Sequence, residues 1–180
     1  KKAAERGDSV AQLNLGIMFQ YGKGVDQDYS KAVQWYKKSA EQGQAEAQTS
    51  LGWMYENGKG IEEDDAEAIF WYKKAAEQGD TKAQLKLGII YKNGNGIDED
   101  YTQSFYWYKK VAEQGDAKAQ LNIGTMYEFG KGTTQDYSQA VHWYKKAAEQ
   151  GQSEAQTSLG WLYENGKGTD KDYTQAISWY

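Results

Sequence analysis

The chain has 180 residues, a net charge of −5 at pH 7, a sequence pI of about 5.0 and neither cysteine nor proline. The negative charge disfavours binding to a nucleic-acid phosphate backbone, and the lack of cysteine excludes disulfides. No apolar run approaches the ~20 residues of a membrane span. The sequence therefore predicts no nucleic-acid partner and no insertion into a membrane.

Tryptophan recurs at an unbroken spacing of 36 residues, at Trp35, Trp71, Trp107, Trp143 and Trp179. A fixed period between 20 and 50 residues is typical of a solenoid made of stacked supersecondary units. We expect one repeat array over 1–180, in which 1–7 are the end of a preceding helix. The repeats are predicted at 8–43, 44–79, 80–115, 116–151 and, truncated, 152–180.

Each repeat begins with a predicted helix, called helix A. In the first repeat Ala11, Leu15, Met18 and Phe19 recur on one apolar face, and Gly22 is suited to the left-handed position that ends a helix. The following Gly-Lys-Gly or Gly-Asn-Gly turn occurs in every repeat. We predict helix A at 8–21, 44–57, 80–93, 116–129 and 152–165.

A second predicted helix, called helix B, completes each repeat. Asp28 is placed to cap it, and Trp35 and Tyr36 lie on its buried face. The capping aspartate recurs at Asp64, Asp100, Asp136 and Asp172. We predict helix B at 28–42, 64–78, 100–114, 136–150 and from 172 to the end.

Every helix A also contains an internal glycine, at Gly16, Gly52, Gly88, Gly124 and Gly160. A glycine inside a helix costs about 0.5–1 kcal/mol relative to alanine. Its recurrence therefore predicts close approach of a large side chain, and we expect the tryptophan of helix B to fill that space.

The repeated pattern resembles the Sel1-like repeat, a relative of the tetratricopeptide repeat. The resemblance covers the whole chain and is carried in the second repeat by Ala47, Leu51, Gly52, Tyr55, Gly58, Gly60, Asp64, Ala68, Trp71, Ala75 and Ala76. It implies an all-α fold, a right-handed α/α superhelical solenoid with helix A on the concave side. It also implies a protein-interaction scaffold, with bacterial envelope or secreted proteins among its relatives and a periplasmic, secreted or cytoplasmic location.

Two further features concern the array as a whole. Residues 1–7 match 145–151, and Tyr180 would continue into Lys1 in register, so we expect an excerpt of a longer array whose uncapped ends associate head to tail. Residues 8–43 resemble 116–151, and 44–72 resemble the corresponding part of the last repeat. A duplicated block of three repeats would place two similar binding surfaces three repeats apart.

The sequence offers no catalytic or metal site. The Gly-Lys-Gly turns lack the spacing and preceding strand of a phosphate-binding loop. The acidic run at 98–100 lacks the calcium-loop pattern, and Asp100 is explained by helix capping. His142 is the single histidine and has no partner for a triad or a metal site. We therefore predict no enzymatic activity and no cofactor.

Comparison of the repeats with one another separates constant from variable positions. The variable positions of helix A are spaced 4, 3 and 4 residues apart and form one stripe on the helix, the variable stripe. Aromatic residues are the usual anchors of protein interfaces, so we predict a protein-binding groove. The variable stripe comprises Val10, Asn14, Ile17, Tyr21, Glu46, Ser50, Trp53, Asn57, Lys82, Lys86, Ile89, Asn93, Lys118, Asn122, Thr125, Phe129, Glu154, Ser158, Trp161 and Asn165.

Two alternatives stay open at this stage. Trp53 and Trp161 either face a ligand or pack between adjacent A helices. The chain is either a non-catalytic scaffold for a peptide or protein partner, or a regulatory or structural module of an envelope-associated or secreted enzyme or host-interaction complex whose chemistry lies elsewhere.

Overall fold

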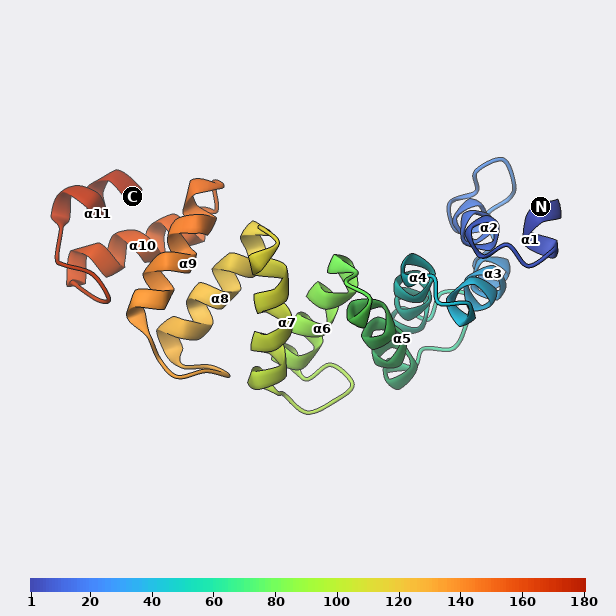
Figure 1. The fold of residues 1–180 in the computed structure, drawn as a ribbon, viewed down its shortest axis with the longest axis horizontal. Coiled ribbons are helices and arrows are strands. Elements are labelled where there is room, and N and C mark those ends of the chain that lie inside the picture. Colours follow the sequence, from blue (N-terminus) through green and yellow to red (C-terminus); the bar gives the residue numbers. More distant parts are fainter. The chain divides into compact units, whose positions relative to one another are not determined.

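A computed structural model describes all residues, 1–180, as eleven α-helices without a strand (Figure 1). Every predicted helix is present, and each end lies within one residue of its predicted position. The helices are α1 (Lys2–Glu5), α2 (Ser9–Tyr21), α3 (Tyr29–Glu41), α4 (Ala45–Glu56), α5 (Asp65–Glu77), α6 (Thr81–Asn93), α7 (Tyr101–Glu113), α8 (Ala117–Phe129), α9 (Tyr137–Glu149), α10 (Ser153–Asn165) and α11 (Tyr173–Trp179).

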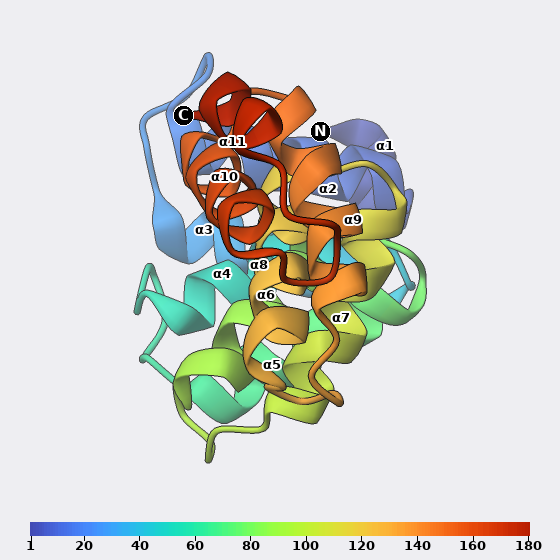
Figure 2. The same cartoon turned by 90° about the vertical axis from the view of Figure 1, so that its left-hand side faces the viewer.

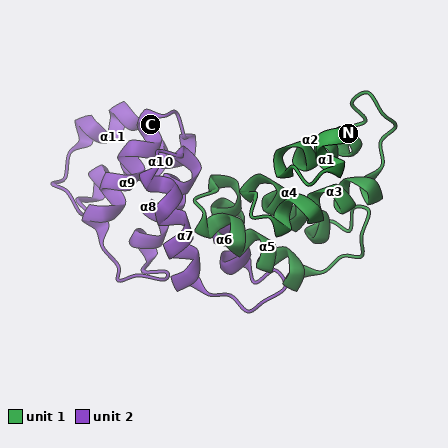
Figure 3. Cartoon of the chain, turned by 45° about the vertical axis from the view of Figure 1, so that its right-hand side comes forward, with its two compact units in different colours: residues 1–87 green, residues 88–180 purple.

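The chain forms two compact units, Lys1–Leu87 and Gly88–Tyr180 (Figure 3). The A helices are α2, α4, α6, α8 and α10, and the B helices are α3, α5, α7, α9 and α11. Within the first unit, α2 packs against α3, α3 against α4 and α4 against α5. Within the second unit the same order runs from α7 to α11 (Figure 2). Successive helices thus pack against one another from α1 to α5 in the first unit and from α7 to α11 in the second.

The aspartate caps predicted for the B helices are confirmed. Each capping carboxylate accepts a hydrogen bond from the backbone N–H three residues later, at 2.9 Å for Asp28 and 3.0 Å for Asp64. Asp100, Asp136 and Asp172 do the same at 2.9–3.0 Å. Such a bond satisfies a backbone donor that the helix itself leaves unpaired, so the five aspartates fix where the B helices begin.

The second glycine of each turn has a role beyond breaking the helix. Gly60 and Gly168 have φ angles of 71° and 70°, in the left-handed region. A Cβ at Gly60 would lie 2.3 Å from the backbone carbon of Tyr29, and one at Gly168 would lie 2.2 Å from that of Tyr137. Any side chain at these two positions would therefore clash with the first turn of the preceding repeat's helix B, whereas a Cβ at Gly24 would meet only the side chain of Met18, at 3.8 Å.

The constant residues of helix A form the core. Ala47, Leu51 and Met54 of α4 are fully buried, and so are their counterparts Ala119 and Ile123 of α8. The first repeat differs from this pattern, because Ala11, Leu15, Met18 and Phe19 are only half-buried. Only the four-residue α1 precedes α2, so the first repeat has less structure on that side to cover it.

The expectation that tryptophan fills the space beside the internal glycine is wrong, because the adjacent tyrosine fills it. A Cβ at Gly52 would lie 2.9 Å from the ring of Tyr72, and one at Gly124 would lie 2.6 Å from the ring of Tyr144. The same pairing joins Gly16 to Tyr36, Gly88 to Tyr108 and Gly160 to Tyr180. Successive helical residues point about 100° apart, so the tyrosine faces helix A and the tryptophan lies to one side.

The tryptophans of helix B are consequently less uniform than predicted. Trp107 and Trp143 are buried, with 7% and 6% of their surface exposed, whereas Trp35 and Trp71 are only half-buried. Trp179 is half-buried, like Trp35 and Trp71. The tyrosines Tyr36 and Tyr72, by contrast, are completely buried. The repeating aromatic core therefore centres on tyrosine rather than on tryptophan.

Buried glutamines connect one repeat to the next. The side chain of Gln48 donates from Nε2 to the carbonyl oxygen of Ala40 at 3.1 Å and accepts at Oε1 from Gln78 at 2.7 Å. Gln12 and Gln120 make equivalent pairs of bonds, with Ala4 and Gln42 and with Ala112 and Gln150. Because a buried polar group requires a partner, these amides fix how helix A packs on the preceding helix B.

Candidate protein-binding surface

The variable stripe lies on the outer side of the A helices in both units, and none of its twenty residues is buried. Val10, Tyr21, Ile89, Phe129 and Trp161 are large apolar residues with 52%, 62%, 40%, 61% and 41% of their surface exposed. The first unit holds the stripe from Val10 to Lys86, and the second holds it from Ile89 to Asn165. The concave position implied by the resemblance stays a prediction.

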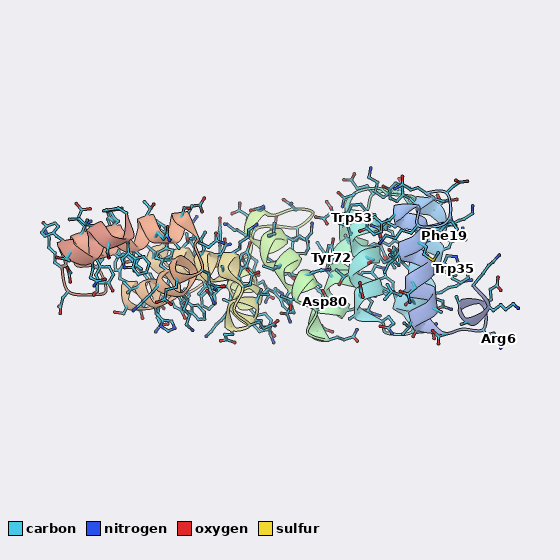
Figure 4. All side chains as sticks on the ribbon, turned by 90° about the horizontal axis from the view of Figure 1, so that it is seen from above. Arg6, Phe19, Trp35, Trp53, Tyr72 and Asp80 are labelled. Atoms are coloured by element: carbon cyan, nitrogen blue, oxygen red, sulfur yellow. The ribbon has the colours of Figure 1, made fainter.

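Trp53 is half-buried on α4, and in Figure 4 it lies toward the same edge of the first unit as Phe19, opposite Arg6 and Asp80. Trp161 occupies the equivalent place on α10 and is more exposed. Both indoles thus keep accessible surface, Trp161 more than Trp53.

The asparagine that follows each of these tryptophans closes the helix end. Asn57 donates from Nδ2 to the carbonyl oxygen of Trp53 at 2.8 Å, and Asn165 donates to that of Trp161 at 2.9 Å. In α4 the same carbonyl also accepts the backbone N–H of Asn57 at 3.2 Å, so backbone and side chain of one residue share it. The asparagine side chain is therefore held in place beside the indole.

Lys86 is engaged within the protein rather than available to a ligand. Its Nζ lies 2.8 Å from both carboxylate oxygens of Glu56 on the preceding helix A. The hydroxyl of Tyr72 donates to the same carboxylate at 2.6 Å. Burial, and secondarily the hydrogen bond to Glu56, raises the pKa of the Tyr72 hydroxyl. This position of the stripe therefore joins successive repeats.

Other repeats build the same junction from different residues. Asn122 of the stripe accepts from the Nζ of Lys92 at 2.9 Å. The hydroxyl of Tyr144 is 2.6 Å from Glu128 and 3.1 Å from Thr125. At two of the positions equivalent to Asn14, the stripe residues Lys86 and Asn122 thus contact the preceding repeat. Other stripe residues remain exposed to a partner.

A second exposed aromatic surface lies on the B helices and was missed in the sequence analysis. Phe70 and Tyr106 have 45% and 49% of their surface exposed. Their rings meet the adjacent tryptophans edge to face, with centroids 5.1 Å and 4.8 Å apart, and the Nζ of Lys74 lies 4.6 Å from the Phe70 centroid. The signal in the sequence is that this position varies, with Gln34, His142 and Ser178 in the other repeats, as a surface position does.

The residues that could have formed a catalytic, calcium or phosphate site make structural contacts instead. Asp100 caps α7, and His142 meets the ring of Trp143 edge to face at 5.3 Å. The lysines of the glycine turns lie over tyrosine rings, as Lys131 does over Tyr101 at 5.0 Å. No group of three or more histidine, cysteine, aspartate or glutamate side chains could hold a metal ion, and none of the helices has the length and apolar character to span a bilayer.

Comparison with known proteins identifies similar repeats. The sequence model of the Sel1 repeat matches residues 9–44, 45–80, 81–116, 117–152 and 153–180. A protective antigen of uropathogenic Escherichia coli strains with an SLR fold is 40% identical over 98% of this chain, with a TM-score of 0.90. The chain spans only 38% of that antigen's length.

Two other solved structures extend the comparison. A Sel1 repeat protein from Oxalobacter formigenes is 40% identical, with a TM-score of 0.89 over 97% of this chain and 72% of its own. Cysteine rich protein B of Helicobacter pylori is 27% identical, with a TM-score of 0.54 over 72% of this chain and 92% of its own. No curated protein matches the sequence.

Proposed function

The chain belongs to the Sel1 repeat family, and we propose that it is a non-catalytic scaffold that binds a peptide or protein partner along the variable stripe. Sel1 repeat proteins are generally protein-interaction scaffolds, and the family is one of non-enzymatic repeats. What this chain binds, and where, is our proposal.

The observation that carries the proposal is the contrast between constant and variable residues of one helix. The inner face of helix A is nearly identical in all repeats and buried, whereas the outer face changes and exposes Tyr21, Phe129 and Trp161. Exposed aromatic residues on a rigid helical frame provide contact area at low entropic cost. A surface that the fold leaves free to vary is suited to a specific partner.

Selection from a library of random twelve-residue peptides, displayed on phage, tests the proposal. We expect peptides that bind the immobilised chain with affinities measurable by calorimetry. Replacing Trp53 or Trp161 by alanine should weaken binding by about 2 kcal/mol, the threshold usual for an interface hot spot. Phe70→Ala and Tyr106→Ala, on the B helices, are matched controls and should leave affinity unchanged. Peptides that lose affinity only with the control variants would contradict the proposal.

The second hypothesis, a regulatory or structural module of a larger envelope-associated, secreted or host-interaction complex, has one supporting observation. The E. coli relative is a protective antigen, and this chain spans 38% of it, so related repeats occur within a longer protein. In such a complex the same stripe would bind a subunit or an adjoining domain. Co-expression with neighbouring genes, followed by purification on this chain, would distinguish a fixed subunit from transient peptides.

A further inference from the structure

Four asparagines of the chain are followed directly by glycine, namely Asn57, Asn93, Asn95 and Asn165. In such a pair the backbone nitrogen of the glycine can attack the side-chain amide carbon of the asparagine and close a five-membered ring, because glycine has no side chain to shield that nitrogen. All four asparagines are exposed. Access to water therefore does not distinguish them, whereas the hydrogen bonds of the two reacting groups do.

The side-chain amides of Asn57 and Asn165 are bonded to their own helices. Nδ2 of Asn57 donates to the carbonyl oxygen of Trp53 at 2.8 Å, and Nδ2 of Asn165 donates to that of Trp161 at 2.9 Å. Each side chain must give up this bond before it can rotate toward the nitrogen of the next residue. These two asparagines of the variable stripe are therefore protected from ring closure.

The nitrogen that would attack is also bonded at three of the four pairs. The N–H of Gly94, which follows Asn93, donates to the carbonyl oxygen of Ile90 at 2.9 Å. The N–H groups of Gly58 and Gly166 likewise donate to carbonyl oxygens of the helices that they follow. Attack requires the nitrogen to lose its proton and to move toward the side chain, so each of these bonds raises the barrier.

Asn95 and Gly96 lie in the turn between α6 and α7 and have neither restraint (Figure 1). The backbone N–H of Asn95 donates to the carbonyl oxygen of Ile90 at 3.3 Å, but its side-chain amide and the N–H of Gly96 form no hydrogen bond. The other four turns have lysine at the position of Asn95, as at Lys59 and Lys131, and lysine cannot undergo this reaction. Both reacting groups are thus free at this pair alone.

We propose that Asn95 is a site of spontaneous modification, at which deamidation converts the asparagine to aspartate and isoaspartate. The nitrogen of Gly96 gives up its proton to water and bonds to Cγ of Asn95, while the bond between Cγ and Nδ2 breaks and Nδ2 leaves as ammonia with a proton taken from water. A second water molecule then opens the ring. Cleavage at Cγ gives aspartate, and cleavage at the backbone carbonyl gives isoaspartate. Water is the only co-reactant, and nothing is oxidised or reduced.

The modification would change the charge of this turn. Three acidic residues follow at 98–100, and no lysine or arginine occurs between Lys92 and Lys109. A carboxylate in place of the Asn95 amide would add a further negative charge where the other turns have a lysine. Since Asn95 lies outside the variable stripe, the inference does not rest on the proposed scaffold function.

Incubation of the folded chain at mildly alkaline pH in water enriched in 18O tests this inference. Each event introduces a labelled oxygen, and mass spectrometry of peptides obtained with pepsin at acidic pH assigns it to one asparagine. We expect Asn95 to convert on the order of tenfold faster than Asn57 or Asn165, because each hydrogen bond that must break adds to the barrier. Asn93, with one such bond, should be intermediate. Equal rates at Asn95 and Asn57 in the folded chain would overturn the inference.

The same measurement in urea shows whether the structure is the cause. In the unfolded chain all four asparagines precede a glycine and none has a fixed hydrogen bond, so their rates should become similar. The largest acceleration on unfolding is expected at Asn57 and Asn165, and the smallest at Asn95. If the unfolded chain reacts at all four sites while Asn95 stays intact in the folded chain, the turn protects it and the inference fails.

Two variants assign the acidic product. Asn95→Lys places the residue of the other turns at this position and should remove the fast-forming acidic species from an anion-exchange profile. Asn14→Lys makes the same change at another exposed asparagine, which is followed by leucine rather than glycine. It is the matched control, for which the acidic species should persist. Loss of this species in both variants, or in neither, would contradict its assignment to Asn95.

Discussion

The two faces of helix A differ in burial and in how much their residues vary between repeats. On the inner face, Leu51 and its counterparts in the three following repeats are fully buried, and Gly52 admits the ring of Tyr72. On the outer face, Trp53 corresponds to isoleucine or threonine in other repeats without any change in the helix. The difference shows that packing determines the inner face, whereas the outer face is available for specificity. Substitutions should therefore separate stability from binding.

The largest expected effect on stability is at the tyrosine of helix B. Tyr72 is fully buried and its hydroxyl is bonded to Glu56. Tyr72→Ala should lower the free energy of unfolding by about 3–5 kcal/mol, as for other large buried aromatic residues. Trp71→Ala, at the adjacent and half-buried position, should cost about 1–2 kcal/mol. Urea unfolding followed by circular dichroism measures both. A larger loss for Trp71→Ala would restore tryptophan as the centre of the core.

The buried glutamines should rank next. Gln48→Leu preserves volume but removes one hydrogen bond from the carbonyl oxygen of Ala40 and one from the amide of Gln78. That carbonyl still accepts from the N–H of Gly43, and that amide still donates to the carbonyl of Lys74. Two lost bonds at about 0.5–1.5 kcal/mol each give an expected loss of about 1–3 kcal/mol. Gln103→Leu, at an exposed position of α7, is the control and should change stability by less than about 0.5 kcal/mol. Equal effects would mean that the glutamines do not join the repeats.

Alkaline pH should destabilise the fold through the buried tyrosines of the B helices. Burial raises the pKa of Tyr108 to about 12, above the ordinary value of 10.0. Between these values the unfolded chain releases the phenolic proton and the folded chain retains it, so stability falls as pH rises. The expected slope is about 1.4 kcal/mol per pH unit for this group, with full stability kept below pH 10.

Denaturant unfolding at pH 8, 10 and 11 measures this dependence. Tyr108→Phe removes the titrating group without breaking a hydrogen bond in the structure, so its curve should be flatter by that amount. Tyr36 and Tyr144, whose pKa values are also raised mainly by burial, would account for the slope that remains. A pH profile identical for the variant and the parent would show that Tyr108 is not protected by the fold.

A smaller effect is expected at the internal glycine. A Cβ at Gly124 would lie 2.6 Å from the ring of Tyr144, and overpacking of this kind costs about 1–3 kcal/mol. Alanine recovers up to about 1 kcal/mol through its higher helix propensity. Gly124→Ala should therefore destabilise by about 1–2 kcal/mol in urea unfolding. If the variant is more stable than the parent, the ring can move aside and close approach does not explain the glycine.

The period, the caps and the glycine turns made nearly all of the fold predictable from the sequence. Two features were not. Trp35 and Tyr36 are adjacent and both aromatic, so the pattern could not tell which of them faces Gly16. Gln12 recurs in all five repeats and Gln42 in the four complete ones. Polar residues on helices are usually exposed, and only the tertiary arrangement brings these two together.

The variable stripe was predictable because repetition within the chain acts as an internal comparison. What that comparison could not give is which variable positions also join repeats. Lys86 looks as free as Lys82 in sequence, yet its Nζ is held by Glu56. Lys86 differs from Lys82 because Glu56, 30 residues earlier, lies beside it. The repeat period alone does not predict that contact.

The smallest expected effect on stability, and the sharpest separation of the two faces, is at Trp161. Its ring is 41% exposed and belongs to the outer face of α10. Trp161→Ala should change the free energy of unfolding by less than about 1 kcal/mol, since alanine's helix propensity offsets part of the lost contact. The same variant should weaken the binding of the selected peptides by about 2 kcal/mol, the threshold usual for an interface hot spot. Leu159→Ala, two residues earlier on the fully buried face, is the matched control and should cost about 2–5 kcal/mol while binding per folded molecule is kept. If Trp161→Ala were as destabilising as Leu159→Ala, the indole would be part of the core and the division between the two faces would not hold.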